Sequence, residues 1–465
     1  MSAIQSTEII VLGGGPAGYV AAIRAAAKGY SVVCVSPELG GTCLHRGCIP
    51  SKFLLNISKQ WDFITSDKSA KMGIKISDAS FELPSMIDRK NKITYTLQSG
   101  IEAKFKKNNI TWIKEKGELL DDNIVQTDSG VKVRASKAVI LATGSQIINI
   151  PFQNPDQVPL DTSDTALNWT QSPKSLLVVG AGYIGLELAS VWARFGAKVR
   201  VIDKSDKFLP FLDSDVSEYI FKQLSKIMDI KLGITIDKLK ACTQNQPAAI
   251  QATLTDQTVW QGERVLCAVG RKADLSSVKI QLSVDNNLIA VDKFMQTNQK
   301  QIYAIGDITK GPMLAHKASE QAWIAVEHIY SQFPPNTPNI RKSCVPTMGA
   351  IPSVMYIDPE VAVVGLTEQE LEKGAYEVHK ISFNTNGRAF AYDKTDGFIK
   401  IICDKKDQII LGGCVVGERA ESIVCQIAVA MAFGATMNDL ATICYPHPSF
   451  DESLRDLAFE ASVWG

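Results

Sequence analysis

Hydrophobic and polar positions alternate along the chain in short blocks that predict strands, each followed by a helix. The block Glu8–Leu12 is β-rich and runs through a glycine turn into a helix-forming stretch at Tyr19–Lys28. The same order returns at Ser175–Val179 and Leu186–Phe195. Repeated strand–turn–helix units predict an α/β fold with mainly parallel sheets up to about residue 343.

Other apolar blocks extend this pattern to the end of the chain. We expect further strands at Val139–Leu141, Lys198–Ile202, Ile302–Ile305, Val361–Gly365 and Ile409–Val416, and a helix at Glu421–Phe433. The last three elements predict an α+β arrangement for the C-terminal part.

The first glycine turn has the spacing of a dinucleotide-binding loop. Gly13 allows a tight turn, Gly15 lets the backbone approach a pyrophosphate, and Gly18 packs helix on strand. The phosphates would then meet the N-terminus of a helix. One match of this kind is a weak signal, because glycine-rich turns are common.

A second turn with the same spacing makes coincidence much less probable. Gly180, Gly182 and Gly185 stand between a predicted strand and a predicted helix. Two such loops in one chain predict two bound dinucleotides or their halves.

The residue that follows the next strand distinguishes the two nucleotides. Asp203 ends the strand after the second loop, where a carboxylate accepts hydrogen bonds from a ribose hydroxyl and repels a 2′-phosphate, so we expect NAD rather than NADP. The equivalent position after the first loop is Ser36, which has no charge. Either Glu38 or a weaker contact from Ser36 takes that role.

Two further turns are typical of a flavin site. A predicted strand ends in Ala142, followed by Thr143, Gly144 and Ser145. Another ends in Gly306–Asp307, whose carboxylate could hold a sugar-alcohol hydroxyl or simply initiate a turn.

A pair of cysteines lies shortly after the first glycine loop. Cys43 and Cys48 are five residues apart, and a regular helix would separate their Cα atoms by about 8.7 Å, beyond the usual disulfide limit of about 7 Å. A bond between them needs a local distortion, for which Gly47 provides the freedom. So small a ring stabilises a fold little, which favours a redox switch over a structural bond.

Composition and charge exclude several other classes of protein. The 465 residues suggest three or four compact units, and 45% hydrophobic and 21% charged residues are ordinary for globular proteins. Basic and acidic residues number 49 each, so no global field attracts nucleic acid or an anionic membrane. The apolar stretches predict no transmembrane helix, the polar start does not resemble a secretory signal, and the ten cysteines lack the pairing of a metal site.

The segment Gly40–Lys52, both glycine loops, Ala142–Ser145, Gly306–Asp307 and the ending Tyr445–Glu452 together resemble the flavoprotein pyridine nucleotide-disulfide oxidoreductases. The resemblance covers essentially the whole chain. Within the family it is strongest to the dihydrolipoamide dehydrogenases, because the redox segment reads Cys-x4-Cys-Ile-Pro-Ser-Lys.

The resemblance implies roles for six residues. Cys48 would lie against the flavin, and Cys43 would exchange with the substrate sulfur. Lys52 would pair with Glu187 and help to position flavin and nicotinamide. His447 would be the acid–base for the dithiol, and Glu452 would orient it.

It also implies FAD and NAD as cofactors. The implied cofactor contacts are Gly13, Gly15, Gly18, Glu38, Thr42, Lys52, Thr143, Gly144, Ser145, Gly180, Gly182, Gly185, Glu187, Asp203, Gly270, Asp307, Met313, Leu314, Ala315 and His316. Three departures from the family pattern are Ala273–Asp274 after Gly270–Lys272, Tyr445 where many relatives have His, and Ser449 in place of Thr.

The expected organisation follows from these markers. It comprises an FAD domain at 1–145, an NAD domain at 146–271, a central segment that completes the FAD site at 272–343, and an α+β dimerisation domain at 344–465. Since the family supplies the histidine segment from the partner subunit, we expect a homodimer.

The expected reaction is the oxidation of protein-bound dihydrolipoamide through the disulfide and FAD, with reduction of NAD⁺. The protein partner would be the lipoyl-bearing acyltransferase of a 2-oxo acid dehydrogenase complex or the glycine cleavage H protein. We expect a cytoplasmic protein, or one in an organelle matrix if a leader has been removed. The rivals are an NADPH-dependent glutathione-type reductase, which Asp203 and Ile49–Ser51 disfavour, and a non-catalytic flavin-containing scaffold.

Overall fold

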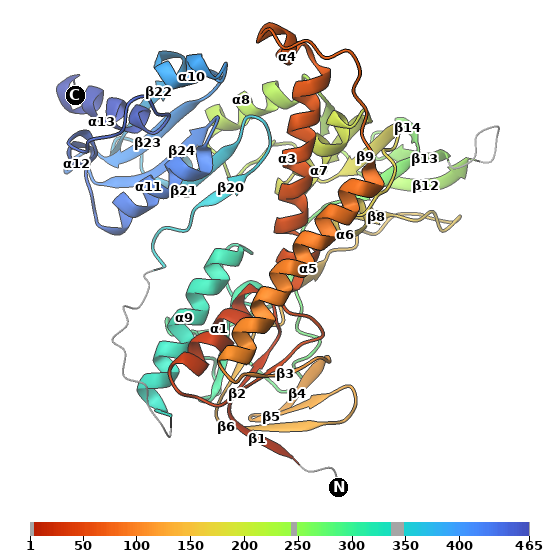
Figure 1. Ribbon diagram of the computed structural model, residues 1–465, viewed down its shortest axis with the longest axis vertical. Helices are drawn as coiled ribbons and strands as arrows, with labels where there is room; N and C mark the ends of the chain where they lie inside the picture. Colours follow the sequence, from red (N-terminus) through yellow and green to blue (C-terminus); the bar gives the residue numbers. More distant parts are fainter. Residues whose placement is uncertain (1–3, 243–248, 336–347, 465) are drawn as a thin grey trace.

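The computed structural model describes residues 4–242, 249–335 and 348–464 (Figure 1). The expected boundary between residues 343 and 344 lies outside the described residues. Three sheets of five or more strands organise the described chain, and the second and third of them share a hydrophobic cluster. The long helices α3 and α5 run between the first two sheets (Figure 1).

The first sheet has seven strands, six from the N-terminal part and one from much later in the chain. They are β1 (Gln5–Leu12), β2 (Val32–Val35), β3 (Thr111–Ile113), β4 (Gly117–Asp121), β5 (Ile124–Thr127), β6 (Lys132–Leu141) and β19 (Ile302–Ala304). The strands β3, β2, β1, β6 and β19 pair in parallel, whereas β4, β5 and β6 form an antiparallel meander.

Two helices from distant parts of the sequence share a core on this sheet. They are α1 (Pro16–Ala27) and α9 (Ala315–Gln332), which pack side by side (Figure 1). Through β19 and α9, the segment after residue 272 is built into the first sheet and its helical layer. The other helices of this part are α2 (Gly41–Arg46), α3 (Cys48–Thr65), α4 (Asp67–Lys71) and α5 (Leu83–Lys107).

The second sheet is parallel throughout and has the order β11-β10-β9-β15-β8. Its strands are β8 (Asp161–Thr162), β9 (Ser175–Val179), β10 (Lys198–Asp203), β11 (Asp229–Leu232) and β15 (Arg264–Cys267), and its helices are α6 (Ser163–Ala166), α7 (Tyr183–Arg194) and α8 (Ser214–Leu224). An antiparallel sheet of β12 (Ile236–Cys242), β13 (Ala249–Leu254) and β14 (Val259–Gly262) lies beside it. The remaining short elements are β7 (Ser145–Ile147), β16 (Arg271–Ala273), β17 (Val284–Asp285), β18 (Leu288–Ile289) and η1 (Gly306–Ile308).

The C-terminal sheet is antiparallel, with the order β20-β21-β24-β23-β22. Its strands are β20 (Ser353–Met355), β21 (Val361–Gly365), β22 (Tyr376–Ser382), β23 (Phe398–Asp404) and β24 (Ile410–Val416). Around it lie α10 (Gly387–Ala391), α11 (Ala420–Ala432), α12 (Met437–Ala441), α13 (Glu452–Trp464), η2 (Glu368–Glu370) and η3 (Phe383–Thr385). This α+β unit confirms the expected fold class.

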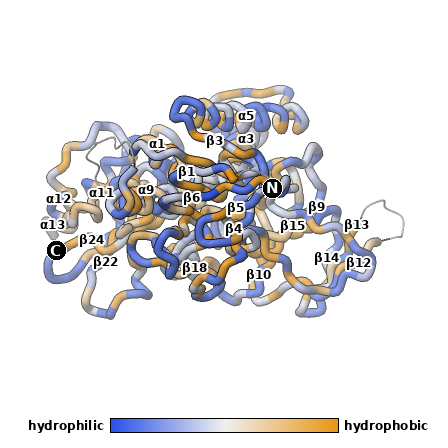
Figure 2. The backbone as a smooth tube through the Cα atoms, turned by 90° about the horizontal axis from the view of Figure 1, so that it is seen from below, coloured by the Kyte–Doolittle hydropathy of each residue, from blue (hydrophilic) through white to orange (hydrophobic). Residues whose placement is uncertain are grey.

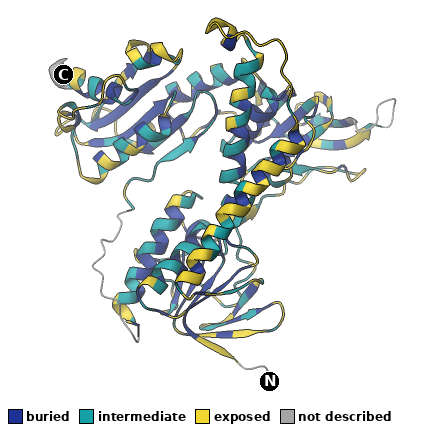
Figure 3. Ribbon diagram, viewed as in Figure 1, coloured by how far each residue is buried: buried dark blue, intermediate teal, exposed yellow. Residues whose placement is uncertain are grey.

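Burial follows the alternation of the sequence. The central strands of each sheet are apolar and buried, while the outer face of α5 is exposed (Figures 2 and 3). The predicted strands lie within three residues of the observed ones, except that β6 begins at Lys132, seven residues before the predicted Val139, and both loop helices begin three residues earlier than predicted. Pro16 starts α1, because a proline is well suited to the first turn, where its missing N–H costs no hydrogen bond. Gly18 and Gly185 therefore lie inside helices.

Candidate active site

The first glycine loop has the geometry of a phosphate cradle. Gly13 has φ of 115°, and a Cβ on it would lie 2.1 Å from the carbonyl oxygen of Ala142. A Cβ on Gly18 would lie 1.9 Å from the carbonyl oxygen of Gly13, so helix and turn are in direct contact. A Cβ on Gly15 would meet no atom within 4 Å.

Gly15 is thus the one glycine of the three that faces open space. It is also the N-cap of α1 and makes no side-chain cap, which leaves the first N–H groups of the helix pointing outward. These features fit the pyrophosphate of a dinucleotide such as FAD.

The second loop repeats this geometry. Gly180 has φ of 110°, and its Cβ would lie 2.4 Å from the carbonyl oxygen of Ala268. A Cβ on Gly185 would lie 2.0 Å from the carbonyl oxygen of Gly180, whereas one on Gly182 would meet no atom within 4 Å. Gly182 is the uncapped N-cap of α7. The loop therefore fits a second dinucleotide.

Asp203 is fixed against the second loop. Its carboxylate accepts hydrogen bonds from the N–H of Ala181 at 2.7 Å and the N–H of Ser205 at 2.8 Å. The acid is therefore at the edge of the loop, where a ribose would lie.

At the first loop, both candidate residues lie beside Gly14. A Cβ on Gly14 would come within 2.4 Å of the carbonyl oxygen of Glu38 and 2.7 Å of Oγ of Ser36. The Glu38 carboxylate is held by Arg46, whose Nη1 lies 3.0 Å from Oε2. Ser36 donates to the carbonyl oxygen of Glu38.

Cys43 and Cys48 form a disulfide with a Cα–Cα distance of 4.7 Å. The expected distortion is present: α2 ends at Arg46, Gly47 is not helical, and α3 begins at Cys48. A Cβ on Gly47 would lie 3.0 Å from the carbonyl oxygen of Thr42. The chain therefore folds back on itself closely enough to bring the two sulfurs together.

The disulfide helix is packed onto the first phosphate cradle. A Cβ on Gly41, the first residue of α2, would lie 2.7 Å from Cα of Gly15. Thr42 and Cys43 follow directly in the same turn of α2. A dinucleotide seated on Gly15 is thus adjacent to the segment that carries the disulfide.

Lys52 and Glu187 form the ion pair that the resemblance implied. Lys52 Nζ lies 2.9 and 3.1 Å from the two carboxylate oxygens of Glu187, which is only 6% exposed. Glu187 Oε1 also accepts the N–H of Tyr356 at 3.0 Å, and Lys52 Nζ lies 4.6 Å from the centre of the Tyr356 ring. Tyr356 gave no signal in the sequence, because only the fold brings the C-terminal part to this point.

The flavin-type turns meet in one hydrogen-bonded network. Ser145 Oγ donates to Asp307 at 2.6 Å and accepts from Arg271 Nε at 2.8 Å. Thr143 Oγ1 donates to the carbonyl oxygen of Asp274 at 2.6 Å, and the N–H of Asp274 donates to Gly144. The departure at Ala273–Asp274 therefore leaves the turn intact. Gly270, with φ of 114°, leads into the strand β16 that pairs with β7.

The stretch from Met313 to His316 leads into α9 beside Asp307. Leu314 is the N-cap, Ala315 begins the helix, and His316 Nε2 bonds to the carbonyl oxygen of Pro352 at 2.8 Å. The next residue, Lys317, is 1% exposed, and its Nζ donates to the carbonyl oxygens of Gly306 and Thr309. Burial lowers the pKa of Lys317. This lysine holds the turn that carries Asp307.

His447 and Glu452 form the expected pair. His447 Nδ1 lies 3.0 Å from Glu452 Oε2, and the side chains are 80% and 7% exposed, respectively. Ser449 Oγ accepts the N–H of Glu452, while Glu452 accepts the N–H of Ser449. This reciprocal arrangement resembles a capping box.

Within a single chain, His447 and Glu452 do not lie beside the disulfide. The loop with His447 leads into α13, at the outer edge of the C-terminal sheet, whereas α3 begins at Cys48 in the centre of the molecule (Figure 1).

The structure also locates the free cysteines. Of the seven in the described residues, Cys34, Cys267, Cys403 and Cys414 are buried, Cys242 is intermediate, and Cys425 and Cys444 are exposed. Four of these seven thiols are therefore shielded from solvent. In the described ranges, no helix has the length and apolar character needed to cross a membrane.

Two family descriptions match nearly the whole chain. "Pyridine nucleotide-disulphide oxidoreductase" matches residues 7–322, and the dimerisation domain of the same family matches residues 351–458.

Individual relatives agree with this match. Dihydrolipoyl dehydrogenase 3 of Pseudomonas putida is 36% identical, with 98% of each chain covered. Dihydrolipoyl dehydrogenase 1, mitochondrial, of Arabidopsis thaliana is 34% identical over 98% of this chain and 90% of the relative. The solved structure of an HOCl-induced flavoprotein disulfide reductase from Escherichia coli has a TM-score of 0.82 at 24% identity, covering 97% of this chain and 99% of that one.

Proposed function

The chain belongs to the pyridine nucleotide-disulphide oxidoreductase family, and on that premise we propose that it is a dihydrolipoyl dehydrogenase. It oxidises protein-bound dihydrolipoamide through the Cys43–Cys48 disulfide and FAD, and it reduces NAD⁺ to NADH. The observation that carries the proposal is the contact of the disulfide helix with the first phosphate cradle, at Gly41 and Gly15.

In this proposal each domain binds a different cofactor or supplies different catalytic residues. Residues 1–145 and 272–343 hold FAD, with Gly15 at the pyrophosphate and Asp307 at a sugar-alcohol hydroxyl. Residues 146–271 hold NAD, with Gly182 at the pyrophosphate and Asp203 at the ribose. Residues 344–465 supply the acid–base pair and the dimer contact.

The side chains of the protein carry out the thiol–disulfide exchange and the proton transfer. A thiolate of dihydrolipoamide attacks Cys43, which breaks the disulfide and forms a mixed disulfide, and Cys48 leaves as a thiolate. The second substrate thiol then displaces Cys43, which completes the lipoamide disulfide and leaves two reduced cysteines. FAD, when bound, accepts the electron pair and passes it to NAD⁺.

His447 accepts the proton of the attacking thiol. Glu452 is nearly buried and holds Nδ1, so that Nε2 is free to face the substrate. Lys52, held by Glu187, places a positive charge one helical turn after Cys48, where it favours the thiolate.

A homodimer completes the site. The His447 side chain is 80% exposed in one chain, as is expected for a group that acts on the disulfide of a second copy. Apolar side chains are exposed on the same C-terminal part, with Phe433 at 86% and Val429 at 57% exposure. A second copy would cover this surface.

The NAD preference rests on Asp203, because a carboxylate fixed beside the second loop repels a 2′-phosphate. The lipoyl group would be carried by the acyltransferase of a 2-oxo acid dehydrogenase complex or by the glycine cleavage H protein. We propose a cytoplasmic protein, or an organelle-matrix protein if a leader has been removed.

The test compares substrate pairs and one cysteine variant. The wild type should turn over dihydrolipoamide with NAD⁺ and show little activity with NADPH and glutathione disulfide. Cys43→Ser should remain yellow and lose dithiol oxidation, whereas the control Cys242→Ser, at a thiol outside the site, should keep the wild-type rate. Full turnover by Cys43→Ser, or a preference for NADPH with glutathione disulfide, would reject the proposal.

A further inference from the structure

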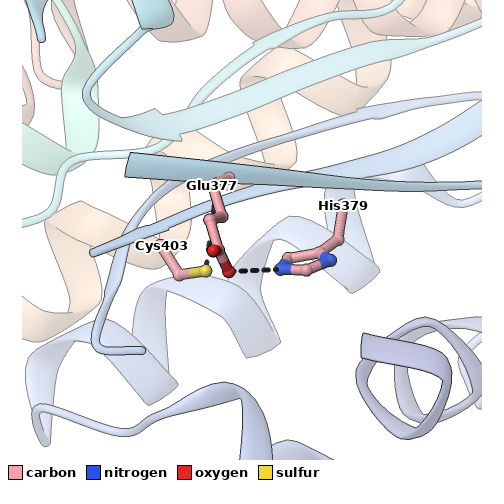
Figure 4. Close-up of side chains that lie close together, drawn as sticks. All are labelled: Glu377, His379 and Cys403. Carbon is pink, nitrogen blue, oxygen red and sulfur yellow. Dashed lines mark hydrogen bonds and ion pairs between the residues drawn. The ribbon is translucent and has the colours of Figure 1, made fainter. Parts of the chain in front are cut away.

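Three chemically different side chains lie close together on the C-terminal sheet, far from the disulfide in sequence. Glu377 and His379 are two apart on β22, and Cys403 is on β23 directly opposite Glu377. Side chains two apart on a strand share a face, as do directly opposed residues on paired strands. One ligand atom from each lies within 4.8 Å of the others (Figure 4).

His379 is unsatisfied within this group. Its Nε2 atom is buried and has no hydrogen-bond partner. The Glu377 carboxylate oxygen lies 3.9 Å from this nitrogen, which is beyond hydrogen-bonding distance. A buried ring nitrogen without a partner is costly, and a bound ligand would remove that cost.

Gln408 adds a fourth polar group. Its Oε1 accepts a hydrogen bond from Cys403 Sγ at 3.2 Å, and its Nε2 donates to the Glu377 carboxylate at 2.8 Å. Gln408 therefore holds the thiol and the carboxylate toward the same point. Its Oε1 atom is in hydrogen-bond contact with the sulfur.

We propose that Glu377, His379 and Cys403 bind a divalent transition-metal ion of the zinc class, with Gln408 Oε1 or water as the fourth ligand. Imidazole nitrogen, thiolate sulfur and carboxylate oxygen are the three donors that Zn²⁺ takes from proteins. In a tetrahedral site such donors lie about 3.4 to 3.6 Å apart, given metal–ligand lengths of about 2.0 to 2.3 Å. Binding therefore requires the three side chains to move closer together than they are in the free protein.

The position of the group allows the ion to enter. β22 is the edge strand of the C-terminal sheet, and the Glu377 side chain is 37% exposed while Cys403 is fully buried. The carboxylate thus faces solvent and the sulfur faces the core. A second group of possible metal ligands in the described chain is Asp213, Asp215 and Glu368. The ammonium group of Lys400 already lies among those three carboxylates and takes the place of a metal ion.

Binding must displace a proton. Burial, with the nearby charges of Glu377 and Asp404, raises the pKa of the Cys403 thiol to about 11. The step is Cys403–SH plus M²⁺ giving Cys403–S–M⁺ and one H⁺, with no change of oxidation state. We therefore expect the apparent affinity to rise with pH.

The sequence did not predict this site. Cysteine spacing gives no signal for it, because the ligands lie on two strands, with Cys403 24 residues after His379, and include one cysteine only. The proposal is independent of the proposed reaction.

The test uses Co²⁺ as a spectroscopic probe on the full-length holoprotein with Cys43 and Cys48 kept oxidised, so that the redox pair is not available as a ligand. We expect one equivalent of Co²⁺, with a thiolate-to-cobalt charge-transfer band in the difference spectrum. Zn²⁺ should displace it.

Matched variants decide the assignment. Cys403→Ser should abolish the charge-transfer band, and His379→Gln should weaken binding at least tenfold. Cys414→Ser, at another buried thiol of the same sheet, should bind as the wild type does. If Cys403→Ser does not fold, His379→Gln, at a partly exposed side chain, decides alone. Absence of binding by the wild type, or unchanged binding by His379→Gln, would overturn the proposal.

Discussion

Replacing Gly182 by alanine should weaken nicotinamide binding without disturbing the fold. Gly182 has φ of −89° and ψ of −174°, a conformation that alanine adopts without strain, and the added Cβ would meet no protein atom within 4 Å. The methyl group would instead occupy the space in which a pyrophosphate approaches the N-terminus of α7. We expect unfolding free energy to change by less than about 1 kcal/mol.

The size of the effect follows from the hydrogen bonds that the methyl group would prevent. A charge-assisted bond to a phosphate contributes about 1.5–3 kcal/mol, and each 1.4 kcal/mol is a factor of about ten in affinity. Loss of one such bond should raise the dissociation constant for NADH about 10- to 150-fold. Reduction of the flavin by dihydrolipoamide, followed by stopped-flow absorbance, should keep its wild-type rate.

Two other glycines serve as controls. Gly185→Ala would place its Cβ 2.0 Å from the carbonyl oxygen of Gly180, so this variant should lose thermal stability rather than only affinity. Gly100→Ala, inside α5 with no atom within 4 Å of the added Cβ, should keep the NADH affinity and lose no stability, because alanine favours a helix interior more than glycine does. An unchanged NADH affinity in a well-folded Gly182→Ala would refute the assignment of this loop to the pyrophosphate.

Three further outcomes follow from the structure. His447→Gln should slow dithiol oxidation about 10²- to 10⁴-fold while electron transfer from NADH to an artificial acceptor keeps its rate; equal losses in both assays would contradict the assignment. Burial raises the pKa of Glu360 from 4.5 to about 7, against the attraction of Lys59. The folded state therefore binds the proton of Glu360 more tightly than the unfolded chain does, and the stability that this group contributes is lost as the pH rises from about 4.5 to 7. Glu360→Gln should be more stable than the wild type by up to about 3 kcal/mol at pH 8, but not at pH 4. Urea unfolding at the two pH values would measure the difference. Lys400→Met should destabilise the protein by about 3 kcal/mol, because it leaves the nearly buried Asp213 without its cation; an unchanged denaturation midpoint would contradict this.

Local patterns were sufficient for the parts of the site that depend on short segments. The loop at Gly13–Gly18 is largely specified by its own glycines, since Gly18 is required by its contact with Gly13 and Gly15 leaves open space, although the contact that requires Gly13 comes from the distant Ala142. The break at Gly47 was predictable in the same way, because helix geometry alone prevents a disulfide five residues apart.

Contacts between distant segments could not be predicted from such patterns. Tyr356 reaches Glu187 only because the C-terminal sheet packs beside α7, and no periodicity encodes that arrangement. Cys403 and His379 meet through strand register, which depends on the pairing of β22 with β23 rather than on either strand alone.

The Lys52–Glu187 ion pair links the helix that begins at the disulfide to the helix that begins at the second loop. Lys52 is four residues after Cys48, the first residue of α3, and Glu187 is four residues after Tyr183, the first residue of α7. With a rise of about 1.5 Å per residue, each helix start lies about 6 Å along its axis from the ion pair. Because α3 and α7 pack together, the pair holds the disulfide end of one helix beside the nucleotide end of the other. Because the Glu187 carboxylate is nearly buried, a shift of either helix by one turn would leave it without its cation and is therefore disfavoured.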